Sequence, residues 1–419
     1  MGTSLFSITN RLRKSLGSNC VYAIRCYWAE RKQDRLHARL SPLGALKTIM
    51  PELDQWVDSG KKVCAGDLCY IIRDLRKRHR YRHALEATEW MFSKDVYKIT
   101  PSEHALRLDL IGKVHGSESA ETYFNSLEEK NQNEKTYGAL LNSYAREKLT
   151  DKALSHMQKM KQLGFASTSV PYDNIMCLYS NTGQHEKVPE VFTQMKNYRV
   201  VPCNFSYRIC INSYGERSDI RGMEKVLKEM KAQKHFTMDW NTYAAVANVY
   251  LKAGLTDKAT ATVEQTEKVL QKESQRDGYN RLISLYGSLG NKSAVNRIWE
   301  LLKSSCKKII NKEYMTMLGS LVKLKELDEA ESLLKDWDTC GNDFDFRVPN
   351  ILLSAYCQQG MLQKAESMLE DYVKKGRVPK PYSYLVLAEA FEKNGETGKA
   401  SEYRKKAEET NATVAEASA

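Results

Sequence analysis

The sequence lacks the features that would indicate a membrane protein, a disulfide-bonded protein or an enzyme. No apolar stretch approaches the roughly 18 residues that a membrane-spanning helix needs. The ten cysteines include no Cys-x-x-Cys pair and no secretory signal is present, so we expect reduced thiols rather than disulfides or a zinc knuckle. No Ser, His and Asp set and no pair of carboxylates stands out, so the sequence indicates neither catalysis nor a cofactor.

Acidic residues are missing from the start of the chain. No acid precedes Glu30, whereas residues 1–40 carry eight lysines and arginines against Glu30 and Asp34, which is +6 of the net charge of +12. A basic segment with several serines is typical of an organellar transit peptide, and a disordered basic tail is the alternative. We predict a transit peptide over residues 1–40 and, because the segment is rich in arginine, a mitochondrial destination, with the chloroplast as second choice.

What the sequence does contain is a repeat. "TYGALLNSYAREKLTDKAL" at 136–154 returns as "TYAAVANVYLKAGLTDKAT" at 242–260, a shift of 106 residues, which is three units of about 35. A fixed period indicates one elongated array rather than separate globular domains. The first tyrosine of the pattern recurs at Tyr137, Tyr172, Tyr207, Tyr243, Tyr279, Tyr314 and Tyr384. A second series follows seven residues later at Tyr144, Tyr179, Tyr214, Tyr250, Tyr286, Tyr356 and Phe391.

Each unit contains the pattern of two amphipathic helices. In the unit 134–168, Tyr137, Leu140 and Tyr144 belong to one stripe with helical spacing, which predicts helix A and makes these tyrosines core residues. A second stripe begins at Ala153 and predicts helix B. Glycine punctuates the turn between the helices, where a left-handed backbone is easy for it. These turn glycines are Gly183, Gly254, Gly290, Gly360 and Gly395.

One pair of helices cannot bury its stripes alone, so the units must stack. The predicted fold is all-α, a right-handed α-α superhelix (solenoid) of about ten 35-residue helix-turn-helix repeats, with helix A lining a concave surface. We expect an N-terminal helical cap over 41–64, the repeat array over 65–411 and a disordered tail over 412–419. The predicted units are 65–99, 100–133, 134–168, 169–203, 204–239, 240–275, 276–310, 311–345, 346–380 and 381 to about 411.

The period near 35, the tyrosine at the fourth place of helix A and unit ends such as "MKNYRVVPC" (195–203) resemble pentatricopeptide repeats. The stretches "LDQWVDSGKKV" (53–63) and "LRKRHRYRHALEATEWM" (75–91) resemble a subfamily of short plant organellar proteins made only of such repeats. The resemblance covers roughly residues 41–411. It implies non-catalytic binding of single-stranded RNA in organellar RNA metabolism or translation.

The resemblance also implies which residues face RNA. In the family, each repeat reads one base with the fifth and the last residue of the unit, and the second residue packs against the base. No unit here pairs Asn, Thr or Ser at the fifth place with Asp, Asn or Ser at the last, as the family pattern requires. Phe205 and Tyr382 at second places can stack on a base. The residues that can meet phosphates are Lys135, Lys312, Arg347 and Lys380.

Contact that is electrostatic and weakly sequence-specific therefore fits these residues better than base reading. The candidate RNA-binding residues are Thr168, Asp173, Phe205, Arg208, Asp239, Asn280, Lys312, Asp345, Arg347, Asn350, Lys380 and Tyr382. The degenerate reading positions leave an alternative function open. In that alternative the chain is a structural or adaptor subunit of the mitochondrial ribosome or another ribonucleoprotein, held through protein contacts.

A basic run at 73–86, "RDLRKRHRYRHALE", has two interpretations. It either holds RNA phosphates or forms a solvated helix end followed by a turn. Its His79 and His83 are four residues apart, but the repeat register places His79 in the turn and no third ligand follows at ligand spacing, so we predict no metal site.

Overall fold

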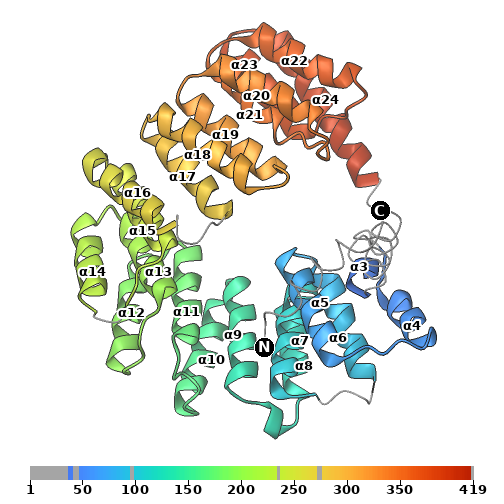
Figure 1. Cartoon of the computed structure of the whole chain (residues 1–419), viewed down its shortest axis with the longest axis vertical. Helices are drawn as coiled ribbons and strands as arrows, with labels where there is room; N and C mark the ends of the chain where they lie inside the picture. The colour runs from blue at the N-terminus through green and yellow to red at the C-terminus, as the bar shows by residue number, and fades with distance from the viewer. Residues whose placement is uncertain (1–35, 41–46, 95–98, 234–235, 271–275, 417–419) are drawn as a thin grey trace, which may run out of the picture. The chain divides into compact units, whose positions relative to one another are not determined.

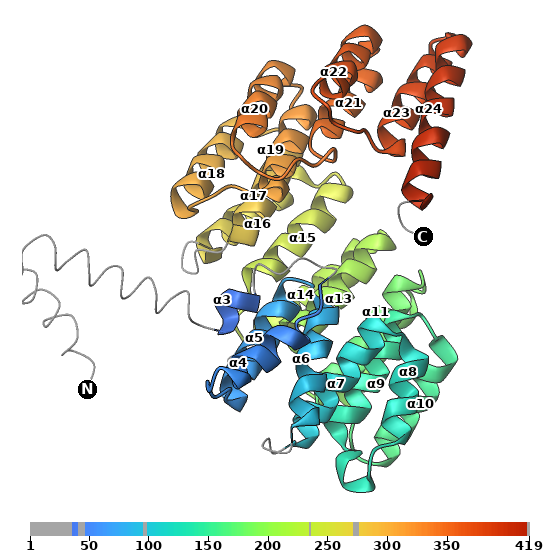
Figure 2. The same cartoon turned by 90° about the vertical axis from the view of Figure 1, so that its right-hand side faces the viewer.

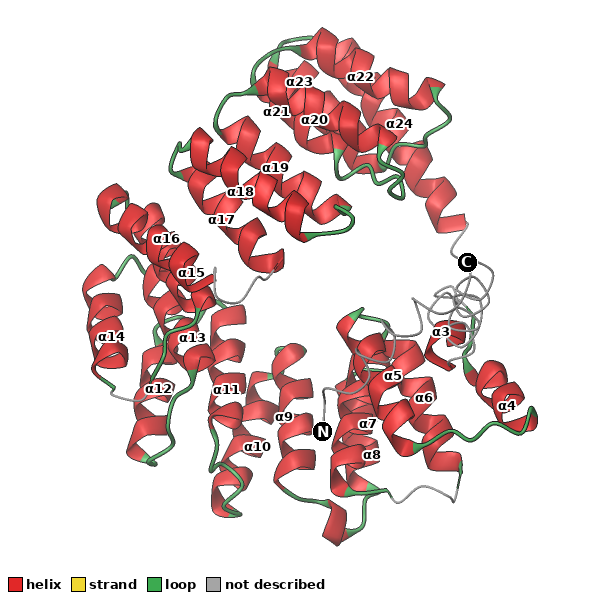
Figure 3. Ribbon diagram, in the orientation of Figure 1, coloured by secondary structure: helices red, strands yellow, loops and turns green. Residues whose placement is uncertain are grey.

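The computed structural model describes residues 36–40, 47–94, 99–233, 236–270 and 276–416, and the regular structure of these residues is entirely helical (Figure 3). The chain divides into two compact units at Val201 and Pro202. No helix among the described residues is long and apolar enough to cross a membrane. Most of the predicted transit peptide, residues 1–35, lies outside the described residues.

The first unit contains a short N-terminal pair of helices followed by four helical hairpins, α5–α6 to α11–α12 (Figure 1). A 3-10 turn, η1 (Glu129–Asn131), precedes α9. The helices are α3 (Leu36–Leu40), α4 (Met50–Asp58), α5 (Ala65–Lys77), α6 (Tyr81–Ser93), α7 (Pro101–Val114), α8 (Ser117–Asn125), α9 (Glu134–Arg146), α10 (Thr150–Gln162), α11 (Ser169–Asn181) and α12 (Lys187–Asn197).

The second unit contains six further hairpins, α13–α14 to α23–α24, of which α23 and α24 lie side by side in both views (Figure 2). The ten hairpins coincide with the ten predicted units, and this prediction is confirmed. The helices are α13 (Asn204–Glu216), α14 (Ile220–Ala232), α15 (Trp240–Lys252), α16 (Thr256–Leu270), α17 (Arg276–Ser288), α18 (Lys292–Ser305), α19 (Asn311–Lys323), α20 (Leu327–Thr339), α21 (Pro349–Gln358), α22 (Leu362–Lys374), α23 (Pro381–Lys393) and α24 (Thr397–Glu416).

The core of each hairpin is the pair of stripes found in the sequence. In α9–α10, Tyr137, Leu141 and Tyr144 are at most 4% exposed, and Ala153 and Met160 of α10 are fully buried. The first helix of each hairpin, helix A, also packs against helix A of the next hairpin within each unit, as α7, α9 and α11 do. Burial is therefore shared between neighbouring repeats, which is how a stack of hairpins forms a core.

The turns between the helices have left-handed backbones, as expected, at all five predicted glycines, with φ between 71° and 85°. Four other hairpins place a non-glycine residue there, at φ between 56° and 63°: His79, Lys148, Ser218 and Lys325. In each case a backbone N–H after the turn still caps the first helix; the Leu149 N–H, for example, donates to the Tyr144 carbonyl oxygen at 3.0 Å. The turn geometry is therefore the same in the hairpins that have no glycine at this position.

The helices at the two ends of the described chain extend beyond the predicted bounds of 41–411 for the folded part. Residues 36–40 form α3, whose Leu36 and Leu40 are buried and whose His37 Nε2 lies 2.9 Å from Asp74 Oδ2 of α5, so the folded part begins before residue 41. Helix α24 continues to Glu416, so disorder does not begin at 412; the sequence there has no proline or glycine to end a helix. Residues 417–419 lie outside the described residues.

Neighbouring hairpins are also joined by a repeated contact between their second helices, the B helices, which we call the inter-repeat clamp. A glutamate that directly follows a buried residue of one B helix binds a lysine that directly precedes the equivalent buried residue of the next. The clamps are Lys152–Glu121 (2.7 Å), Lys258–Glu224 (2.7 Å), Lys364–Glu331 and Lys399–Glu366 (2.7 Å).

A tyrosine of the second series completes the clamp. Tyr250 Oη of α15 donates to Glu224 Oε1 at 3.1 Å. Burial, together with this carboxylate, raises the pKa of Tyr250 to about 12. The second tyrosine series is therefore core, as predicted, and its hydroxyl group also bonds to the preceding repeat.

Candidate nucleic-acid interface

In the eight predicted units from residue 134 onward, the second residues are all exposed, one near the start of each helix A. Backbone N–H groups at a helix start also carry partial positive charge, which favours an anionic ligand. The most exposed apolar members are Val170 (57%), Tyr382 (58%) and Phe205 (43%). The complete row is Lys135, Val170, Phe205, Asn241, Asp277, Lys312, Arg347 and Tyr382.

The fifth residues are mostly buried. Asp173, Asn280 and Asn350, which the sequence selects as candidate base contacts, are 5%, 5% and 7% exposed. Asn350 Oδ1 accepts a hydrogen bond from Ser383 Oγ of the next helix A at 2.9 Å, so this amide already joins two repeats. Both amide atoms of Asn280 are buried without a hydrogen-bond partner among the described residues, which leaves its donor and acceptor unused.

The last residue of a unit generally caps the next helix A. Thr168, Asp239 and Lys380 are the N-cap residues of α11, α15 and α23. Asp239 Oδ1 accepts hydrogen bonds from the Thr242 N–H at 2.8 Å and from Thr242 Oγ1 at 2.6 Å. Asp239 therefore stabilises a helix start whether or not it touches RNA, whereas the side chains of Thr168 and Lys380 make no capping hydrogen bond.

The unit 204–239 brings three of the predicted residues together. The Arg208 guanidinium lies 5.2 Å from the centre of the Phe205 ring and its Nη1 lies 3.6 Å from Asp239 Oδ2. The second, fifth and last residues of this unit thus form a single, partly exposed cluster of a ring, a cation and a carboxylate. Such a cluster offers an aromatic face together with a positive charge, and these are the two features that single-stranded nucleic acid requires.

Two of the predicted phosphate-binding cations are already neutralised. Lys312 Nζ lies 2.6 Å from Asp277 Oδ1, and Arg347 Nη2 lies 2.6 Å from Asp345 Oδ2. The hydrogen bond from Arg347 keeps the pKa of Asp345 below its usual value despite partial burial. Because a paired cation gains less from a phosphate, Lys312 and Arg347 are weaker candidates than the sequence suggests.

Two cations of the same face lack a carboxylate partner among the ion pairs of the described residues. Lys135 Nζ contacts Ser102 Oγ at 2.6 Å, a neutral partner, and Lys380 is exposed at the start of α23. These two residues, with Phe205 and Tyr382, are the strongest candidates for RNA contact.

A groove of about 630 Å³ lies along α7, α9 and α11 in the first unit. Lys135, Thr168 and Val170 line it, and Gly138, at the fifth place, leaves open space where a side chain would stand. Asp109 lies at one end of the groove and accepts from Arg76 Nη2 at 2.9 Å and from Asn142 Nδ2 at 3.2 Å.

The sequence analysis did not identify Arg76, Asp109 or Asn142 as site residues. Arg76 and Asp109 belong to the first two units, 65–99 and 100–133, which lie before the tyrosine series begins at Tyr137, so the repeat pattern there is too weak to assign positions. A second groove, of about 520 Å³, lies along α21 and α23 in the second unit and is lined by Tyr382 and Lys393.

The basic run at 73–86 is partly internally paired. Arg76 binds Asp109, Arg78 Nε lies 2.8 Å from Asp74 Oδ2, and Arg82 Nε lies 3.4 Å from Glu86 Oε1. These pairs favour the interpretation of a solvated helix end over a phosphate site. His79 lies in the turn, as predicted, and no group of three metal-ligating side chains occurs in the part of the chain that the structure describes.

Relatives were found over most of the chain. It is 46% identical over 375 residues to the mitochondrial pentatricopeptide repeat-containing protein At4g21705 of Arabidopsis thaliana, a match that covers 89% of this chain and 76% of the relative. It is 39% identical over 361 residues to the mitochondrial protein At4g01990 of the same family and plant, covering 85% and 72%. The chain belongs to the pentatricopeptide repeat family.

Family models match this pentatricopeptide repeat protein in both units. The PPR repeat model matches residues 135–165, 205–235, 314–342 and 348–377, and the pentatricopeptide repeat domain model matches 155–217. The predicted resemblance is therefore confirmed. In the family's terms, the structure joins the fifth and last residues by an ion pair in the unit 204–239.

Solved structures show the same fold. The maize pentatricopeptide repeat protein PPR10 matches 84% of this chain with a TM-score of 0.54 at 16% identity, and this chain covers 54% of PPR10. PPR10 in complex with an 18-nt psaJ RNA element matches 88% of the chain with a TM-score of 0.55 at 14% identity, and the match covers 62% of PPR10. At such low identity, the likeness supports the α-α solenoid fold and no residue role.

Proposed function

We propose that this protein binds single-stranded RNA in the mitochondrion through the exposed starts of its A helices, without catalysis of its own. The observation that carries the proposal is the row of exposed second residues. That row combines the aromatic faces of Phe205 and Tyr382 with the cation Lys135, and the N-cap residue Lys380 adds a second cation at the start of α23; neither lysine forms an ion pair among the described residues. The RNA complex of PPR10 and the mitochondrial names of the relatives support it.

The contacts would be of two kinds. Lysine ammonium groups neutralise phosphates, which gives affinity without sequence preference. Exposed rings stack on bases, and each such contact contributes about 1 to 3 kcal/mol. Base reading is limited, because Asn350 is bound to Ser383 and Arg208 to Asp239; the unpartnered amide of Asn280 is the one buried group in this series that would gain a partner from a base.

Titration of the full chain with a labelled organellar RNA at several salt concentrations tests this proposal. The logarithm of the binding constant should fall with the logarithm of salt concentration, by about 0.7 per neutralised phosphate. Phe205→Ala and Tyr382→Ala should each weaken binding about 5- to 150-fold, the equivalent of 1 to 3 kcal/mol. Absence of binding at low salt would overturn the proposal.

Lysine variants separate the free cations from the paired ones. Lys135→Ala and Lys380→Ala should each reduce the salt slope by about 0.7, because each removes one phosphate contact. Lys312→Ala is the matched control: it occupies the second place of its unit as Lys135 does, but it is neutralised by Asp277. An equal change in slope for Lys312→Ala would show that the ion pair does not decide which cations meet RNA.

A second function is favoured by the neutralised cations Lys312 and Arg347. With half of its predicted phosphate contacts internally paired, the chain would serve as an adaptor subunit of the mitochondrial ribosome or another ribonucleoprotein, bound through protein contacts. Sedimentation of the native protein distinguishes the two functions. Migration with ribosomal subunits supports the adaptor, whereas a small complex that ribonuclease dissolves supports the transcript binder.

A further inference from the structure

The inter-repeat clamp is missing between α10 and α12 although half of it is present. Lys187 of α12 directly precedes the buried Val188, as Lys152 and Lys364 precede their buried residues. The residue that directly follows the buried Ala153 of α10 is Leu154, where the clamps have glutamate. Lys187 therefore has no carboxylate partner among the ion pairs of the described residues, and its Nζ contacts only the neutral Gln184 Oε1, at 2.6 Å, and the face of the Tyr179 ring.

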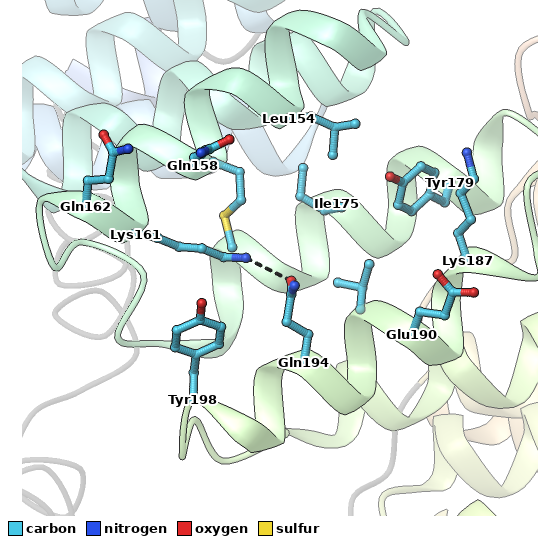
Figure 4. A pocket seen from close by; sticks show the side chains of 12 residues that line it. Leu154, Gln158, Lys161, Gln162, Ile175, Tyr179, Lys187, Glu190, Gln194 and Tyr198 are labelled. Atoms are coloured by element: carbon cyan, nitrogen blue, oxygen red, sulfur yellow. Dashed lines mark hydrogen bonds between the residues drawn. The ribbon is translucent and has the colours of Figure 1, made fainter.

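A groove of about 700 Å³ lies at this position between α10 and α12 (Figure 4). It contains a second lysine, Lys161, whose Nζ donates to Gln194 Oε1 at 2.8 Å and lies 5.2 Å from the centre of the Tyr198 ring. Burial lowers the pKa of Lys161. The groove thus holds two ammonium groups with neutral partners.

The equivalent groove between α20 and α22 in the second unit shows what normally occupies these places. It measures about 300 Å³, and all of its lining positions except that of Tyr372 correspond to one in the first groove, 177 residues earlier. Glu331 stands where the first groove has Leu154, and Asp338 stands where it has Lys161. Glu331 binds Lys364, and Asp338 Oδ2 lies 2.8 Å from Lys375 Nζ, so the chain itself supplies the carboxylates.

The first groove also exposes apolar surface. Leu154 is 37% exposed and Tyr198 is 58% exposed, and the partly exposed Val191 and the buried Met157 and Ile175 also line the groove. Exposed apolar side chains beside unpaired cations are typical of an interaction surface rather than of a solvated helix face.

We propose that the α10–α12 groove binds an acidic amphipathic segment of a partner protein, which supplies the carboxylates that the clamp lacks and covers the apolar floor. Charge complementarity carries the proposal, because the equivalent groove places the carboxylate of Glu331 against Lys364, the counterpart of Lys187, and because Lys161 adds a second ammonium group without a carboxylate. An RNA backbone fits this surface less well, because its phosphates would have no use for the apolar floor.

The test uses the full chain and blocked synthetic peptides in which an apolar residue is flanked by glutamates at helical spacing. The matched peptide has glutamine in place of each glutamate. We expect the acidic peptide to bind, and the glutamine peptide to bind at least about tenfold more weakly, because each ammonium loses a charge-assisted hydrogen bond. A zero-length carbodiimide reagent, which joins an amine to a carboxylate, should link the acidic peptide to Lys161 or Lys187.

Two variants place the test at the groove. Leu154→Glu restores the missing half of the clamp and should reduce peptide binding at least about tenfold while the chain stays folded. Leu163→Glu adds the same charge directly after the end of α10, at an exposed residue that does not line the groove, and should leave binding unchanged. The double variant Glu331→Leu with Asp338→Lys should create a second peptide site, so that the stoichiometry rises from one to two.

Three results would overturn the proposal. Equal binding of the acidic and glutamine peptides would remove the role of charge. Equal binding to the protein before and after Leu154→Glu, or crosslinks only at other lysines, would place the peptide elsewhere. Ultraviolet crosslinking of a single-stranded RNA oligonucleotide to Lys161 or Lys187, with displacement of the peptide, would assign the groove to RNA instead. None of these outcomes depends on whether the starts of the A helices bind RNA.

Discussion

The α10–α12 groove and the α20–α22 groove are formed by equivalent helices but carry different charges at two equivalent positions. In the second, glutamate and aspartate from α20 bind two lysines of α22, whereas in the first a leucine and a lysine occupy those two places. Even the turns agree, since Lys148 and Gly183 in one correspond to Lys325 and Gly360 in the other. The comparison shows that, in a stack of repeats, a contact between neighbouring repeats becomes an open site when one of the two contacting residues is replaced by a residue that cannot make the contact.

Breaking the closed groove should have the largest effect on stability. Glu331→Leu leaves the buried Tyr356 hydroxyl and Lys364 without their acceptor. Lys364 is half exposed and regains water, so the cost comes mainly from the tyrosine, and we expect the free energy of unfolding to fall by about 1 to 2 kcal/mol. Urea denaturation followed by circular dichroism measures it. An unchanged midpoint would show that the clamp contributes nothing.

The same comparison has a pH dependence. Partial burial acts to raise the pKa of Glu331, but hydrogen bonds from Lys364 and Tyr356 outweigh it, so the pKa lies below the ordinary 4.5. A lowered folded pKa means that the clamp stabilises the protein fully above the unfolded pKa and loses this contribution as pH falls. The stability difference between the wild type and Glu331→Leu should therefore shrink between about pH 5 and pH 3. A constant difference across this range would contradict the ionic part of the clamp.

Closing the open groove should have a smaller effect of opposite sign. Leu154→Glu gives Lys187 a carboxylate and removes an exposed leucine, so we expect the free energy of unfolding to rise by about 0.5 to 1 kcal/mol, the range of a partly exposed ion pair. Thermal unfolding of this variant beside Leu163→Glu separates the ion pair from a general effect of charge. A loss of stability would mean that the groove between α10 and α12 cannot adopt the geometry of the clamps.

Substitutions in the turns should change stability equally in both regions, and their effect should be the smallest of those predicted. Lys148→Gly and Lys325→Gly relieve a left-handed backbone at φ 59° and 63°, offset in part by the greater freedom of glycine in the unfolded chain. We expect each to raise the free energy of unfolding by about 0.5 kcal/mol. Gly183→Ala, at φ 75°, should have the opposite sign. Unequal responses at Lys148 and Lys325 would show that the hairpins differ in more than their grooves.

The hairpins could be predicted from the sequence because burial repeats with the chain. Tyr137 and Ala153 recur in register in most units, and the same register gave the turn at Gly183 and at its equivalents. The two ends of the fold could not be predicted in this way. Helix α3 is five residues long and is held by contacts with a helix some 35 residues away, such as the His37–Asp74 contact, and α24 simply continues through helix-forming residues.

The sequence predicted the positions of the candidate residues in the repeats but not the ion pairs that they form. The register identifies Phe205 and Tyr382 as second residues, and their exposure follows from their position at the start of a helix. Lys312 pairs with Asp277 because the second residues of adjacent units are neighbours in space. Their separation of 35 residues, one repeat, is the sequence signal that could have predicted this pair. The Asp109 network arises in units without a clear register, so no sequence signal pointed to it.

Asp239 both caps a helix and pairs with Arg208, and these two contacts limit how such a protein could acquire a new RNA target. Its carboxylate starts α15 through Thr242 and also faces Arg208 at the surface proposed for RNA. Evolution toward another nucleotide at this repeat would have to choose among Asp, Asn, Ser and Thr, the residues that begin a helix well, or accept a weaker helix. The few residue types allowed at this position are therefore limited by helix stability before RNA recognition selects among them.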